Sequence, residues 1–209
     1  MVRFSIFGIP VEVQPFFWIT LVLIGGALGA DSASAILQTL LFVLAGFISI
    51  LIHELGHALT ARKFGAYSSI VLQAFGGIAQ HSGVRLSRPQ SFAVTAAGPL
   101  LQIVLGLAVW YSLPQLTELK PHALYFFHTL MSISFIWAAL NLLPILPLDG
   151  GQMLHAILGP KRQSITLWTT IICATLIGAF VFLQTKSVIF PIFMGLFAWQ
   201  AWQALKRFR

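Results

Sequence analysis

The sequence carries very little charge. Only 8% of its 209 residues are Asp, Glu, Lys or Arg, whereas soluble domains carry about 25%. Hydrophobic residues make up 58% of the chain, and the mean hydropathy is +0.90. This composition excludes an ordinary soluble domain and indicates a polytopic helical membrane protein.

Acidic residues and cysteine are the scarcest functional types. The chain has five acidic residues: Glu12, Asp31, Glu54, Glu118 and Asp149. Its single cysteine, Cys173, excludes an intramolecular disulfide framework. The net charge of +7 would suit nucleic acid, but the basic residues cluster between apolar runs, as the positive-inside rule expects. We therefore expect the lipid bilayer as a partner and no nucleic acid.

The apolar runs predict an all-α polytopic membrane protein with about six transmembrane helices. These lie near residues 15–30, 35–60, 91–113, 123–143, 165–184 and 188–205. Residues 65–87 are glycine-interrupted and rich in β-branched residues, which favours a small β-hairpin region between helices 2 and 3. Residues 3–13 are interpreted as a strand pair or an interfacial segment. We expect 1–209 to form one domain, with a core at about 35–155 and outer helices at 15–30, 165–184 and 188–205.

Basic residues predict the orientation of these helices. Six spans with a cytoplasmic N-terminus place two basic residues, Lys120 and Lys186, outside. They place ten inside: Arg3, Arg62, Lys63, Arg85, Arg88, Lys161, Arg162, Lys206, Arg207 and Arg209. Both termini are therefore expected in the cytoplasm, and the ends of spans two and four on the same side. A bacterial inner membrane fits best, and an organellar membrane is the alternative.

Residues 50–60 read ILIHELGHALT and lie within the second apolar run. His53 and His57 are four residues apart, on one face of a helix, with Glu54 beside them. H-E-x-x-H on a helix is the zinc-metalloprotease signature, and this composition yields roughly 0.002 matches by chance. The alternative is two buried histidines with Glu54 as their counter-ion. A carboxylate at membrane depth is costly, which favours the functional interpretation.

A catalytic zinc takes three protein ligands and keeps a position for water. Asp149 is the best candidate for the third ligand, because it follows a run broken by Pro144 and Pro147 and lies on the expected side of the membrane. The alternative for Asp149 is a helix cap. The other histidines are weaker candidates: His81, His122, His128 and His155. We expect one Zn²⁺ per chain, with Glu54 taking the proton of the attacking water.

Three further residues are candidates for substrate binding. Asn141 would hydrogen-bond the substrate backbone or the oxyanion, or equally bridge two helices. The edge of the hairpin around Gly76 and Gly77 would pair with an extended substrate, or equally be only structural.

HELGH at 53–57 and N-x-x-P-x-x-P-L-D-G at 141–150 together resemble the site-2 protease family of intramembrane zinc metalloproteases. AAGP at 96–99 and the Gly76-Gly77 pair add weaker support. The resemblance implies cleavage of a transmembrane protein within the bilayer. It also implies zinc bound by His53, His57 and Asp149, catalysis by Glu54, and gating by the outer helices.

The sequence departs from this family in two respects. Gln152 and His155 follow the D-G-G where family members often carry a basic residue. The chain has no room for a PDZ-like or CBS-like domain, so we expect any regulator to be a separate protein.

Three other functions compete with intramembrane proteolysis. A membrane metalloprotease of another class would need a glutamate as third ligand, and none follows Glu118. A transporter, or a proton or metal relay, would use the His/Glu/Asp cluster, but internal repeats are missing. A pseudo-enzyme that only binds partners would not need His53, Glu54, His57 and Asp149, and the sequence has all four.

Overall fold

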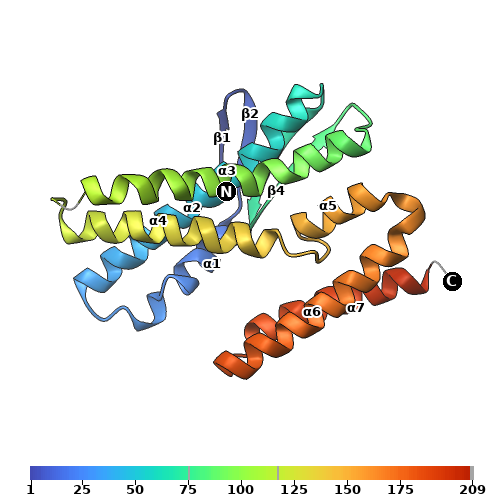
Figure 1. Cartoon of the computed structure of the whole chain (residues 1–209). Helices are drawn as coiled ribbons and strands as arrows, with labels where there is room; N and C mark the ends of the chain where they lie inside the picture. Colours follow the sequence, from blue (N-terminus) through green and yellow to red (C-terminus); the bar gives the residue numbers. More distant parts are fainter. Residues whose placement is uncertain (75, 117, 208–209) are drawn as a thin grey trace. The chain divides into compact units, whose positions relative to one another are not determined.

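The computed structural model describes residues 1–74, 76–116 and 118–207. Arg209, one of the ten basic residues expected inside, lies outside this described part. The contacts between Cα atoms divide the chain into two compact units. The first contains Met1–Arg85 and Ala97–Ala138, and the second contains Leu86–Ala96 and Ala139–Arg209. Figure 1 shows the elements along the chain.

The longest helix of the first unit is α2, Ala33–Lys63. The Ser32 side chain accepts a hydrogen bond from the Ala35 N–H at its start, and Arg62 and Lys63 place positive charge at its C-terminal end. The short helix α1, Pro15–Ile24, precedes it. Most of α3, Arg88–Ser112, and of α4, Pro121–Asn141, also belongs to this unit.

A four-stranded sheet completes the first unit. Its strands are β1 (Val2–Ile6), β2 (Ile9–Val13), β3 (Tyr67–Gln73) and β4 (Gly76–Ser82), in the order β1-β2-β3-β4. The predicted hairpin after the second apolar run is confirmed, and so is the strand pair near the N-terminus. The parallel pairing of β2 with β3, which joins both hairpins into one sheet, was not predicted.

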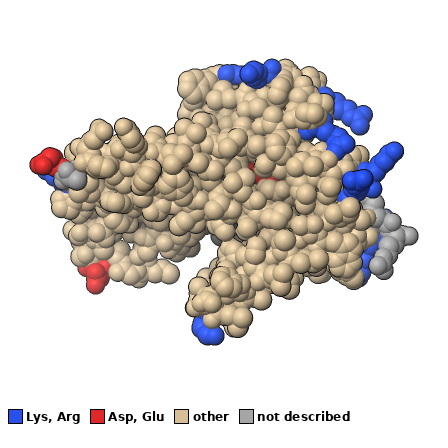
Figure 2. Space-filling model, viewed as in Figure 1, with Lys and Arg blue, Asp and Glu red and all other residues tan. Residues whose placement is uncertain are grey.

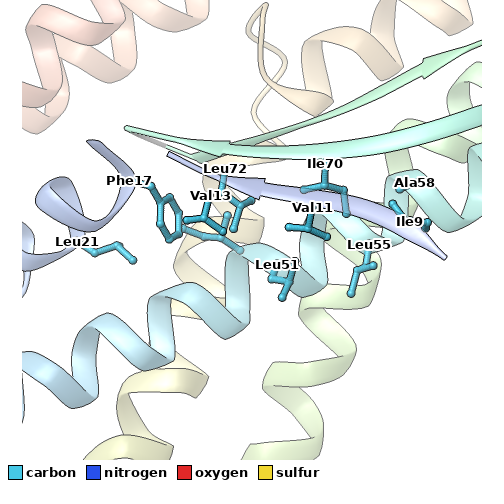
Figure 3. Packing of buried hydrophobic residues seen from close by; sticks show 11 residues of the cluster. Ile9, Val11, Val13, Phe17, Leu21, Leu51, Leu55, Ala58, Ile70 and Leu72 are labelled. Atoms are coloured by element: carbon cyan, nitrogen blue, oxygen red, sulfur yellow. The ribbon is translucent and has the colours of Figure 1, made fainter. Parts of the chain in front are cut away.

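The sheet packs on the second half of α2 (Figure 3). Alternate residues of β2 are fully buried, which is the period of a strand with one covered face. They share a core with α1, α2 and β3, built from Ile9, Val11, Val13, Phe17, Leu21, Ile50, Leu51, Leu55, Ala58, Ile70 and Leu72. This core holds the HELGH helix against the sheet through Leu55, the leucine of the motif, and through its neighbours on the same helix.

The second unit contains α5 (Asp149–Leu158), α6 (Gln163–Thr185) and α7 (Ile189–Lys206). Helix α4 ends at Asn141 and α5 begins at Asp149, so the break predicted at Pro144 and Pro147 is confirmed. The loop between them is held by a bond from the Leu146 N–H to Thr170 Oγ1 of α6 (3.0 Å).

Within the described residues, four helices are long and apolar enough to cross a membrane: α2, α3, α4 and α6. The helix found at the expected first span, α1, is shorter than predicted, because it ends at Ile24, just before Gly25 and Gly26. The helix at the expected sixth span, α7, is less apolar than these four helices, because Gln200, Gln203 and Lys206 lie in its second half. Most of the face in Figure 2 carries no charged residue, as expected of a surface in contact with lipid.

Candidate metal centre

The two motif histidines converge on one point. His53 and His57 lie one turn apart on α2, and both rings are buried. Their Nε2 atoms are 3.1 Å apart, and the rings meet edge to face. Two nitrogens bound to one tetrahedral zinc at about 2.0–2.1 Å would lie roughly 3.3 Å apart. The pair therefore fits two ligands of one zinc ion.

Glu54 lies directly against the backbone of β4. It is buried, and a β-carbon at Gly77 would lie 2.4 Å from its Cγ and 2.6 Å from its Oε1. Only glycine leaves this carboxyl group in its place. The sequence singled out the Gly76-Gly77 pair as a hairpin edge, and its contact with Glu54 was not predicted.

Glycines also allow α3 to approach the histidines closely. A β-carbon at Gly98 would lie 2.3 Å from His57 Nε2, and one at Gly56 would lie 2.4 Å from the Ala97 carbonyl oxygen. Small residues at a helix crossing permit such an approach in membranes. Gly98, the glycine of the AAGP motif, therefore leaves free the space that the His57 ring occupies.

Gln102 is a residue at the site that sequence reasoning missed. It is fully buried on α3, and its Oε1 lies 3.0 Å from His53 Nδ1. One signal was available: Gln102 follows Gly98 by four residues and thus shares its helix face. A buried amide in an apolar helix is costly unless it is hydrogen-bonded.

Asp149 is the first residue of α5, in the second unit. The N-cap position is Leu148, and Asp149 lies in the first turn of the helix. Gly150 and Gly151 press against the preceding loop: a β-carbon at Gly150 would lie 2.2 Å from the Leu142 carbonyl oxygen. The two glycines therefore set the position of Asp149 relative to this loop.

The remaining sequence candidates take different places. Asn141 is half-buried and is the last residue of α4, in the second unit. His81 on β4 and His128 on α4 are exposed, and His122 and His155 are half-buried. In the described part of the chain, none of these four histidines belongs to a group of three metal-binding side chains.

The model of peptidase family M50 matches residues 41–118 and 115–184. The chain belongs to peptidase family M50. This is the family of the site-2 proteases, so the resemblance seen in the motifs is confirmed.

Individual relatives agree with this placement. The M50 chain is 32% identical over 159 residues to a zinc metalloprotease of Methanocaldococcus jannaschii, covering 76% of this chain and 45% of the relative. It is 32% identical over 198 residues to stage IV sporulation protein FB of Bacillus subtilis, covering 88% and 63%. The chain thus spans about half the length of the curated relatives it matches.

A solved structure also matches. The site-2 protease from Methanocaldococcus jannaschii aligns with a TM-score of 0.68 and 27% sequence identity. The alignment covers 98% of this chain and 94% of that one. The match confirms the predicted class of fold, a helical polytopic membrane protein.

Proposed function

We propose that the chain is a zinc-dependent intramembrane endopeptidase, which hydrolyses a peptide bond in or near a transmembrane segment of a membrane protein. One observation carries the proposal: the buried His53, Glu54 and His57 lie inside α2, a helix apolar enough to cross a bilayer. His53 precedes Arg62 by nine residues, about 13 Å along the helix. Catalytic groups at this depth cannot reach a peptide bond that lies far from the membrane.

The proposed zinc ligands are His53, His57 and Asp149. Each offers one ligand atom of a type that zinc accepts. Two imidazoles and a carboxylate leave one position for water or substrate, which is the arrangement of a catalytic zinc. When bound, zinc would supply Lewis-acid activation of a water molecule and of the scissile carbonyl group.

Glu54 is the proposed general base. Its carboxylate would take a proton from the attacking water and pass that proton to the leaving amine nitrogen. The glycine at position 77 supports this role, because it leaves the carboxyl group unobstructed beside the backbone of β4.

The proposed substrate site includes the edge of the sheet. In the described sheet β4 is the last strand, bonded to β3 on one side. An extended substrate segment would pair with its other side by strand addition. Gly76 and Gly77 would lie next to the substrate backbone near Glu54, and the Asn141 amide would donate a hydrogen bond to the substrate or the oxyanion.

The proposed location is a bacterial inner membrane with both termini in the cytoplasm. The charge distribution along the sequence supports this orientation. The proposed partners are a transmembrane protein as substrate and a separate protein as regulator.

Zinc content and cleavage test the proposal together. The full chain would be purified in detergent as wild type, Glu54→Gln and Asp149→Ala, and mixed with single-span reporter proteins. We expect about one zinc in wild type and in Glu54→Gln, cleavage by wild type alone, and loss of zinc in Asp149→Ala. A wild type without zinc, or a Glu54→Gln protein that still cleaves, would contradict the mechanism and favour a transporter or relay.

A further inference from the structure

A chain of buried hydrogen bonds leads away from His53 through three helices. Gln102 Oε1 lies 3.0 Å from His53 Nδ1, and Gln102 Nε2 donates to Ser49 Oγ (2.8 Å). Ser49 Oγ lies 3.0 Å from Ser134 Oγ, which donates to the Leu130 carbonyl oxygen (2.7 Å). Ser49, Gln102 and Ser134 are each 0% exposed. We call these three side chains the buried relay.

Two carbonyl oxygens determine the direction of the bonds in the relay: that of Leu130 at its far end, and that of Ser49, which accepts from Gln102 Nε2 (3.4 Å). The Leu130 carbonyl can only accept, so the single hydroxyl proton of Ser134 is used there. Ser49 must then donate to Ser134, which leaves Ser49 Oγ to accept from the Gln102 amide nitrogen. The Gln102 carbonyl oxygen therefore faces His53, and His53 Nδ1 must carry a proton to bond with it.

The opposite arrangement breaks one of these bonds. With the Gln102 amide turned over, its oxygen would accept from Ser49, and Ser49 would have no proton left for Ser134. Ser134 would then have to abandon the Leu130 carbonyl or leave the Ser49–Ser134 contact without a proton. The turned amide would also place its oxygen about 3.4 Å from the Ser49 carbonyl oxygen, where two acceptors face each other without a proton. The relay thus favours one orientation of Gln102.

We propose that Gln102 is a positioning residue, held by Ser49 and Ser134, that keeps His53 in the tautomer with its proton on Nδ1. This inference rests on the proposed zinc site. In that tautomer the Nε2 lone pair is directed to the side where His57 Nε2 lies 3.1 Å away. Without a partner at Nδ1, the neutral ring can carry its proton on Nε2, where it would block a metal.

Three substitutions separate this role from general packing. Gln102→Leu removes the acceptor for His53. Gln102→Glu keeps an acceptor in either protonation state. Ser134→Ala leaves every atom next to His53 in place but removes the acceptor of the Ser49 proton. Ser49 can then donate to a turned Gln102, and the Ser49 carbonyl oxygen still opposes the turn. The matched control is Thr39→Val, which removes a buried hydroxyl of α2 that bonds the Gly25 carbonyl, about 21 Å along the helix from His53.

The first readout is zinc affinity, measured on the full chain in detergent by competition with a chromophoric chelator. We expect Gln102→Leu to bind zinc about 10–100-fold more weakly, as is typical when the partner of a ligating histidine is lost. Ser134→Ala should weaken binding in the same direction. Gln102→Glu and Thr39→Val should stay near wild type. Equal affinity of wild type and Gln102→Leu would overturn the inference.

The second readout is the tautomer itself, from ¹⁵N NMR of the histidine rings in zinc-free protein, with His53 assigned by its loss in His53→Ala. Wild type should show a protonated Nδ1 and an unprotonated Nε2, and Ser134→Ala should populate the other form. A wild-type His53 protonated on Nε2 would overturn the inference even if zinc binds. A wild type that binds no zinc would instead refute the proposed function, and the positioning role with it.

Discussion

Position 77 has room for a hydrogen atom and no side chain, because the Glu54 carboxyl group occupies the space. Gly77→Ala should therefore displace Glu54 while leaving His53 and His57 in place. Misplacing a catalytic group by about 1 Å can cost on the order of 100-fold in rate. We expect cleavage of a single-span reporter to fall by roughly that factor with the zinc content unchanged, measured by initial rates and metal analysis.

A matched control for Gly77→Ala exists on α7. Gly195 has no heavy atom within 4 Å of an added β-carbon, so Gly195→Ala adds the same methyl group without a clash. It should leave both zinc and cleavage near wild type. Full activity of Gly77→Ala would show that Glu54 does not need its present position.

At the scale of elements, the start of α5 depends on glycine in the same way. A β-carbon at Gly150 would lie 2.2 Å from the Leu142 carbonyl oxygen and 2.4 Å from that of Leu143. Backbone cannot yield as a flexible side chain does, so α5 must move away from the loop. We expect Gly150→Ala to cost about 1–3 kcal/mol of stability and to weaken zinc binding, because Asp149 moves with the helix.

Thermal unfolding and chelator competition would measure these two effects, with Gly195→Ala again as the control. A Gly150→Ala protein with lower stability but wild-type zinc affinity would argue against Asp149 as a ligand. Unchanged stability would show that the loop adjusts at no cost.

Local patterns predicted the elements whose causes are local. The Pro144 and Pro147 pair ends α4, and the glycine-rich run after α2 forms a hairpin. The pairing of β2 with β3 was not predictable, because it joins segments more than 50 residues apart. The same holds for Gln102: its type and spacing were visible, but its partner His53 lies on another helix. The length of α1 was misjudged because Gly25 and Gly26 were counted as part of the apolar run.

At the scale of the whole molecule, the side of the membrane on which each loop lies is a prediction, and the short helix α1 provides a test of it. Its ten residues extend about 15 Å, roughly half of a bilayer core. The orientation inferred from charge nevertheless places residues 31–34 and the turn after α6 on the outer side. The single cysteine makes this measurable, because a Cys173→Ser background has no other thiol.

In that background, single cysteines would replace exposed serines at positions 34, 87 and 187. We expect a membrane-impermeant thiol reagent to label Ser34→Cys and Ser187→Cys in intact cells, and Ser87→Cys only after lysis. Protection of Ser34→Cys would mean that α1 does not bring the chain across. The HELGH helix would then enter the membrane from the cytoplasmic side, and the site would have to receive its substrate from the opposite face.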